Sequence, residues 1–411
     1  MAFGNPKLST AKNIITIVFF FFFGSTYLLF YNTLLNLSDL LATHFDYSLS
    51  YTSTFPLFYN WFNFLVAIIL TVLASFLKKF PFNIFAHLSF VIHIILFIVT
   101  PFVLVYIPSN AAGFWVMIIM STLNGVPTPM NASVFMGLSG MFSGVHSAMY
   151  FIGMAAGGVI SSVLRIISGA IFKNEPNSDF FLSFYLNCMV AMASYAMYIY
   201  MYFAIPITQE LYEQTNIANA GDETQTILKE ETSLQAFIRL IKKMAINLFS
   251  IGFVFFVTLS IFPGFFTNTQ YKALSSSFEQ ASVVLTITTI FMIGDLLSRF
   301  CVYIPIPWNK WLIFIFSVSR VVFYIPVFCY YYIPYTTPWY MFFIMLLFSF
   351  TNGYVSAWAI QIAYKEIDPA DMKVAGNLVM VSMNVGLSIG GTLLFILSST
   401  LPNPLDGSSS A

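Results

Sequence analysis

The chain has 411 residues, of which 59% are hydrophobic, 19% are aromatic and only 8% are charged, and its formal net charge is zero. Water-soluble chains carry about a quarter of their residues as Asp, Glu, Lys and Arg, so this composition excludes a soluble domain. The lack of a basic excess also argues against nucleic acid as a partner, because binding phosphates requires a concentrated cationic surface.

Apolar runs bounded by charge, Pro or Gly predict eleven membrane-spanning helices, because a helix needs roughly 20 apolar residues to cross a bilayer. The first run, 14–30, is apolar on every side, which disfavours a β-barrel strand. It is longer than the apolar core of a secretory signal and lacks a cleavage site, so we expect it to be the first span. The predicted spans are residues 12–37, 53–77, 83–106, 111–134, 140–169, 180–206, 244–265, 280–302, 309–333, 338–363 and 373–400.

One long polar stretch separates six predicted spans from five. We therefore expect an N-terminal six-helix bundle at 1–207, a cytoplasmic linker at 208–243 and a C-terminal five-helix bundle at 244–411. The end of the linker, 234–243, has apolar residues at helical spacing before basic ones, which predicts an interfacial helix. Two bundles around a midplane site are the plan of many transporters, although channels and receptors fit the span count as well.

The lysines and arginines predict the orientation. With a cytoplasmic N-terminus, only Arg165, Lys173 and Lys272 fall outside, as the positive-inside rule requires. We expect an integral multi-pass protein of the plasma membrane, with the C-terminus on the side opposite to the N-terminus.

The stretch FMIGDLLSRF, residues 291–300, places two ions inside the eighth predicted span. Asp295 and Arg299 are four residues apart and share one helical face. Each alone would cost roughly 2.5–3.5 kcal/mol at the bilayer centre, so we expect them to pair and to face a wet interior. The pair could instead be a packing device, or Arg299 could reach the inner membrane edge.

Five other predicted spans carry amides and hydroxyls at helical spacing. Such groups often bond one membrane helix to its neighbour, but that use needs only pairs of helices. We therefore favour a cavity lined by neutral hydrogen-bonding groups, and a cargo that is neutral, polar and partly flat. The residues are Asn32, Asn36, Asn60, Asn63, Asn124, Thr128, Asn131, Ser349, Asn352, Ser356, Asn377, Asn384 and Ser388.

Glycines in two regions predict close approach of helices, and sliding between them is compatible with that role. They are Gly137, Gly140, Gly144, Gly153, Gly157, Gly158, Gly386, Gly390 and Gly391.

Nothing in the sequence indicates catalysis. The histidines His44, His87, His93 and His146 form no metal-ligand spacing, and no Walker A or G-x-S-x-G element occurs. We expect no enzyme activity, no cofactor, no metal and no obligate protein partner. The expected partners are a small-molecule cargo and the lipid bilayer.

Four short motifs occur in order along the chain: GSTYLLFYN, LSIFPG, GDLLSR and FTNGYVSAW. With eleven predicted spans and a long loop after the sixth, the chain resembles an equilibrative nucleoside transporter over essentially its whole length. The resemblance implies an architecture similar to the major facilitator fold. It also implies facilitative transport of nucleosides, and in some members nucleobases, by alternating access.

The resemblance also implies a substrate site. The Asp and Arg associated with the ribose hydroxyls would be Asp295 and Arg299, and Asn352 lies in the FTNGY run. The family's Trp-Asn pair of the first span would fall on Tyr31 and Asn32. The other positions implied near the base are Leu28, Leu35, Leu57 and Asn131.

Three departures from the family pattern bear on the choice of base. Phe30 and Tyr31 stand where Pro and Trp are usual, Met292 replaces an Asn, and Ser298 replaces a Gly. Two other functions stay open: a proton-coupled nucleoside transporter with Asp295 as the proton carrier, and a facilitator of sugars or other small polar metabolites. The loop FLKKFPF lacks the Gly-Asp-Arg pattern of many sugar facilitators.

Overall fold

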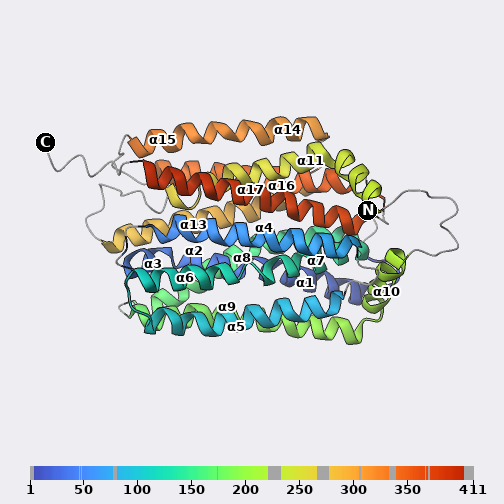
Figure 1. Cartoon of the computed structure of the whole chain (residues 1–411), viewed down its shortest axis with the longest axis horizontal. Coiled ribbons are helices and arrows are strands. Elements are labelled where there is room, and N and C mark those ends of the chain that lie inside the picture. Colours follow the sequence, from blue (N-terminus) through green and yellow to red (C-terminus); the bar gives the residue numbers. More distant parts are fainter. Residues whose placement is uncertain are drawn as a thin grey trace.

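The computed structural model describes residues 4–45, 47, 49–76, 81–173, 175–220, 233–265, 277–304, 307–332, 339–365, 367–368 and 371–401. Every regular element in these residues is a helix, and most of the helices run along one long axis (Figure 1). The predicted all-helical class is therefore confirmed.

The first half contains α1 Thr10–Tyr27, α2 Leu29–Asn36, α3 Ser38–His44, α4 Tyr51–Phe76, α5 Phe82–Tyr106, α6 Ala111–Leu123, α7 Pro127–Phe142, α8 Gly144–Ile171 and α9 Pro176–Ala204. The second half contains α10 Ile207–Ala220, α11 Ser233–Ile261, α13 Ser277–Phe300, η1 Cys301–Tyr303, α14 Lys310–Ser319, η2 Arg320–Phe323, α15 Tyr324–Tyr332, α16 Trp339–Lys365 and α17 Met372–Thr400.

The helices account for ten spans by length and hydropathy in the described residues, and for eleven when the bent pair α1–α2 counts as one. Helix α1 begins at one end of the molecule and α17 ends at the other (Figure 1). An odd number of crossings places the two ends in this way, as the sequence predicts.

The first span bends by 51° between α1 and α2, at Leu28. No proline lies there. One turn earlier, Ser25 and Thr26 donate their hydroxyls to the carbonyls of Phe22 and Phe23 at 2.8 and 2.9 Å. Hydroxyls that bond back to the preceding turn compete with the main-chain hydrogen bonds of the helix and bend it. Ser25 and Thr26 therefore account for the bend.

Prolines break two further spans. Helix α7 starts at Pro127, where a missing N–H has no cost, and α6 ends before it at Leu123, with Asn124 as its C-cap. In the ninth predicted span, Pro326 removes a donor and crowds the carbonyl of Val322. The chain there tightens into the 3₁₀ turn η2, which begins at Arg320.

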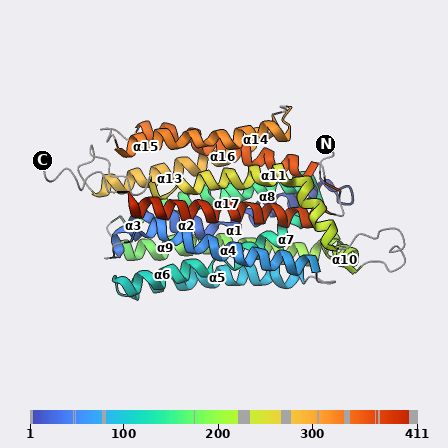
Figure 2. The same ribbon diagram turned by 45° about the horizontal axis from the view of Figure 1, so that its top comes forward.

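The expected linker is partly helical. Its start forms α10, which lies beyond one end of the spans in both views (Figures 1 and 2). The predicted interfacial helix is not separate: it is the beginning of α11, continuous with the seventh span. No Gly or Pro occurs between Ser233 and Gly252, so nothing interrupts the helix.

The two halves of the chain meet along two lines of helices. Helix α13 packs against α16 of its own half and against α8 of the other, while α17 packs against α11 and also against α4 and α7. Glycines let backbones touch within each half. A Cβ at Gly153 of α8 would overlap the carbonyl of Phe21, and one at Gly386 of α17 would overlap that of Gly252. The predicted close approach is therefore confirmed at Gly153 and Gly386. It is wrong at Gly144, where a Cβ would meet nothing within 4 Å.

Candidate functional site

Asp295 and Arg299 form a buried ion pair on α13. The Asp295 oxygen Oδ2 accepts from Nε of Arg299 at 3.1 Å and lies 3.0 Å from its Nη2. The two residues are only 7% and 6% exposed. Because a two-pronged contact of a guanidinium with a carboxylate is strong and fixes both planes, the pair presents a rigid polar surface.

The pair keeps hydrogen-bonding capacity for a further molecule. A carboxylate has about four acceptor positions, and Asp295 uses three: two toward Arg299 and one toward Asn352, whose Nδ2 lies 2.7 Å from Oδ1. A guanidinium has five N–H groups, of which two point at Asp295 and one at a main-chain carbonyl. One acceptor and two donors remain, which suits adjacent hydroxyl groups.

Arg299 also contacts the other half of the chain. Its Nη1 donates to the carbonyl oxygen of Phe151 in α8 at 3.0 Å. One turn earlier on the same face of α13, the sulfur of Met292 fills the space that a Cβ on Gly158 would take, and that Cβ would lie 3.4 Å from Nδ2 of Asn32. The ion pair therefore lies where α13 meets α8 and α2, as a site between two halves requires.

Close packing of α13 and α16 positions Asn352. A side chain on the next residue, Gly353, would overlap the main-chain oxygen of Asp295 and the hydroxyl of Ser298. Ser298 donates to that same oxygen of Asp295 at 2.8 Å. Because only glycine allows this approach, the FTNGY motif brings its asparagine within reach of the carboxylate.

Tyr31 of α2 belongs to an aromatic cluster with α4. Its ring centroid lies 5.2 Å from that of Phe55 and 4.8 Å from that of Tyr59. Leu35, one turn further along α2, is 3% exposed. Leu28 is half-buried at the bend between α1 and α2.

Leu57 lies on another face of α4. It is half-buried, and it stands two residues from both Phe55 and Tyr59, which is 200° around a helix. The rings of those two residues contact the ring of Tyr31. Sequence reasoning missed Tyr59, although its spacing of four from Phe55 is a usable signal.

Asn131 of α7 is fully buried, and it bonds within the first half of the chain. Its Oδ1 accepts from the hydroxyl of Tyr150 at 2.9 Å, and its Nδ2 donates to Thr26 at 3.4 Å. The amide therefore ties α7 to α8 and α1. Its oxygen is already occupied in this structure.

Besides Asn187 and Asn247, which lie outside the predicted polar stripes, three asparagines have amide atoms with no hydrogen-bond partner among the described residues. They are Oδ1 of Asn63 and both amide atoms of Asn124 and of Asn384, and all three residues are fully buried. The backbones of Asn63 and Gly125 are close enough that a Cβ on Gly125 would lie 3.0 Å from N of Asn63.

The third asparagine, Asn384, comes from the other half of the chain. Ser388, one turn after it on α17, donates to the carbonyl of Asn60 on α4 at 2.9 Å. Buried amides without partners are rare, since each costs about 1–3 kcal/mol. These three are therefore candidates for contact with a polar molecule.

A second ion cluster ties α3, α8 and α9 together. Arg165 lies 2.6 Å from Asp179 and 3.2 Å from Asp39. The Asp179 carboxylate also accepts from Ser168 and Ser183. Burial raises the pKa of the Asp39 carboxyl above its ordinary value, and the charge of Arg165 opposes that rise. All of these bonds are internal, so the cluster is structural.

Within the residues described, no group of three or more His, Cys, Asp or Glu side chains has the geometry of a metal site. The site is thus made of one ion pair, amides, hydroxyls and aromatic rings. Such groups bind neutral polar molecules by hydrogen bonds and ring contacts.

The fold is similar to that of the major facilitator superfamily. The proton:xylose symporter XylE of that superfamily matches with a TM-score of 0.59 and 12% identity, over 95% of this chain and 90% of that one. A mutant of the nucleoside transporter NupG matches with a TM-score of 0.55 and 14% identity, over 92% and 90% of the two chains.

Sequence comparisons identify the family. A family model described as "Nucleoside transporter" matches residues 115–399. Equilibrative nucleoside transporter 1 of Mus musculus is 25% identical over 348 residues, which are 74% of this chain and 73% of that protein. Adenosine transporter 1 of Crithidia fasciculata is 33% identical over 193 residues, 44% of this chain and 36% of that one. The chain belongs to the nucleoside transporter family, and it is a transporter rather than an enzyme.

Proposed function

We propose that this chain carries nucleosides across its membrane by facilitated diffusion, with alternating access to one site between the bundles 1–207 and 244–411. The observation that carries the proposal is the ion pair of Asp295 and Arg299, buried where α13 meets α8 and still able to accept one and donate two hydrogen bonds. The 2′ and 3′ hydroxyls of ribose match that capacity.

The base would lie toward α2, α4 and α7. In this proposal Tyr31 and Asn32 provide an aromatic edge and an amide, and Leu28, Leu35 and Leu57 provide apolar contact. Asn131 would act near the base mainly by holding Tyr150. Asn124 and Asn384 would read the polar edge of the base, because their amide groups lack partners among the described residues.

The proposal also includes the membrane and the orientation of the chain in it. The chain would lie in the plasma membrane with its N-terminus and residues 208–243 in the cytoplasm, since the basic residues follow that orientation. The low content of Lys and Arg, 16 in 411 residues, supports rejection of nucleotides, whose phosphates would need a concentration of cations.

The test is uptake of labelled adenosine, inosine and uridine into proteoliposomes that contain the purified protein. Unlabelled nucleosides, nucleobases and free hexoses are added as competitors. We expect nucleosides to enter and to compete, and hexoses not to compete. Failure of all three nucleosides to cross, or equal competition by hexoses, would refute the proposal and favour a facilitator of sugars.

A further inference from the structure

A second arginine is buried close to the proposed site. Arg320 lies on η2 and is 2% exposed, and within the described part of the chain it has no ion-pair partner. Its Nε and Nη1 have no hydrogen-bond partner there either. Burying a cation costs several kcal/mol unless other groups compensate, so its position calls for a reason.

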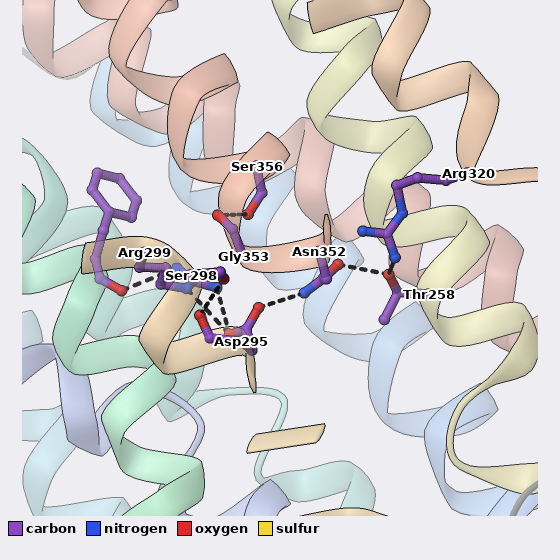
Figure 3. Close-up of polar contacts among 9 residues, drawn as sticks. Thr258, Asp295, Ser298, Arg299, Arg320, Asn352, Gly353 and Ser356 are labelled. Atoms are coloured by element: carbon purple, nitrogen blue, oxygen red, sulfur yellow. Dashed lines mark hydrogen bonds and ion pairs between the residues drawn. The ribbon is translucent and has the colours of Figure 1, made fainter. Parts of the chain in front are cut away.

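The contacts of Arg320 lead toward Asp295. Its Nη2 donates to Oγ1 of Thr258 on α11 at 2.9 Å, and its guanidinium carbon lies 4.9 Å from the ring centroid of Phe348. The Thr258 hydroxyl lies 2.6 Å from Oδ1 of Asn352. Nδ2 of Asn352 then lies 2.7 Å from Oδ1 of Asp295. Figure 3 shows these side chains in a row between the two arginines.

The direction of each hydrogen bond in the row follows from chemistry. An ionised carboxylate only accepts and a guanidinium only donates. Asn352 must therefore turn its nitrogen to Asp295 and its oxygen to Thr258, whose hydroxyl accepts from Arg320. The single proton of that hydroxyl has two acceptors in range, the carbonyl of Val254 at 2.8 Å and Oδ1 of Asn352 at 2.6 Å, and the shorter contact is the one to Asn352. Each bond orients the next, and a charged donor at the far end strengthens the whole series.

We propose that Arg320 is a positioning residue for the sugar site. It acts through Thr258 and Asn352, which hold the carboxylate of Asp295 in one rotamer and leave its remaining lone pair facing the cargo. Arg320 itself does not touch the cargo, because Thr258 and Asn352 stand between it and the ion pair. This inference rests on the proposed function, in which Asp295 binds ribose hydroxyls.

The test removes the hydroxyl of Thr258, which connects Arg320 to Asn352. Thr258→Val keeps the shape of the side chain and removes the hydrogen bonds. Uptake into proteoliposomes is measured for adenosine and for 2′,3′-dideoxyadenosine, which lacks both hydroxyls. Because a hydrogen bond to a charged group is lost at the sugar, we expect the half-saturating concentration of adenosine to rise about tenfold. That of the dideoxy compound should stay unchanged.

Two further variants serve as controls. Thr258→Ser keeps the hydroxyl and should restore the affinity for adenosine. Thr289→Val removes a hydroxyl that bonds only to its own helix, at Leu285, and should leave both substrates as in the wild type. If Thr258→Val does not fold, Arg320→Lys repeats the test, since an ammonium group lacks the planar fork of the guanidinium.

The outcomes separate this inference from the proposed function. If the wild type prefers adenosine to the dideoxy compound and Thr258→Val keeps that preference, or weakens both substrates alike, Arg320 has no positioning role although the sugar site stands. If the wild type does not distinguish the two compounds, the proposed contact of Asp295 with ribose is itself wrong.

Discussion

Arg299 donates from Nη1 to the carbonyl oxygen of Phe151 at 3.0 Å, so one side chain holds both the carboxylate of Asp295 and the backbone of α8. This bond crosses between the two halves of the chain. Any movement that separates α13 from α8 must break it. A cargo that accepts a hydrogen bond from the same guanidinium competes with the carbonyl of Phe151. Its binding therefore favours separation of α13 from α8.

Arg299→Lys should abolish most transport while the protein still folds. An ammonium group keeps the charge but cannot make two contacts with Asp295 and a third with Phe151, because it lacks the rigid fork. We expect the initial rate of adenosine uptake to fall by about tenfold or more, the cost of one charge-assisted hydrogen bond. Monodispersity on size exclusion provides the folding control, and uptake at the wild-type rate would contradict the assignment.

Gly353→Ala should destabilise the protein strongly, because its Cβ would overlap the main-chain oxygen of Asp295. Overpacking of this kind costs typically 1–3 kcal/mol, here roughly at the upper end since backbone has to move. The matched control is Gly144→Ala at the start of α8, where a Cβ meets nothing within 4 Å. Thermal unfolding in detergent should show a lower midpoint for the first variant alone; equal midpoints would refute the close approach.

Two asparagines of the fourth predicted span, Asn124 and Asn131, should respond in opposite ways to replacement by leucine. Asn131→Leu leaves the hydroxyl of Tyr150 buried without its acceptor, which costs about 1–3 kcal/mol and lowers the unfolding midpoint.

Asn124→Leu removes two unpartnered amide atoms, so the midpoint should stay or rise while discrimination among adenosine, inosine and uridine is reduced. Competition assays with the three nucleosides measure the second effect. Unchanged discrimination would exclude Asn124 from the site.

The two acids around Arg165 should differ in their contribution to stability. Burial raises the pKa of Asp39, so at neutral pH its ionised form is less favourable in the folded state than in the unfolded state. That penalty is relieved as the pH falls through the raised pKa. Asp179 lies closer to Arg165, at 2.6 Å, and accepts from Ser168 as well.

Asp179→Asn should accordingly lower the unfolding midpoint at pH 7 much more than Asp39→Asn. Breaking a buried pair costs about 3–5 kcal/mol when one charge is left behind. Thermal melts of both variants and the wild type decide the matter. A larger decrease of the unfolding midpoint for Asp39→Asn than for Asp179→Asn would contradict the prediction.

An imposed pH gradient should not drive accumulation of adenosine. The contacts of Asp295 with Nε and Nη2 of Arg299 and with Nδ2 of Asn352 all need the acceptor-only carboxylate. A proton on Oδ2 would face Nε and Nη2 of Arg299, and a proton on the unused position of Oδ1 would take the acceptor that the cargo needs. Internal adenosine should therefore level off at the external concentration, and accumulation above it that a protonophore abolishes would establish proton coupling instead.

Much of the fold could be predicted from local signals. The length of the apolar runs predicted the spans, and the prolines at 127 and 326 mark breaks that the structure contains. The continuous helix from Ser233 was not predicted, because a polar and basic segment indicates the end of a membrane span. A helix continues through such a segment as long as it contains no Gly or Pro.

The ion pair was likewise predictable from a spacing of four on one helix. The partners of Asp295 across helices were not, because a contact such as that with Asn352 depends on how closely α13 and α16 pack. The amide stripes of the sequence included both Asn124 and Asn131. Only the packing shows that one amide is satisfied and the other has no partner in the described residues.

Hydropathy and helical period are properties of consecutive residues. They were enough to predict a helical membrane protein in which one helix carries an acid and a base on the same face. The tertiary structure alone decided which buried polar groups remain available and that Arg320 joins the same hydrogen-bonded row, 25 positions along the chain from Asp295. Hydrogen bonds between helices depend on distances of a few ångströms across the bundle, and no spacing within a single helix contains that information.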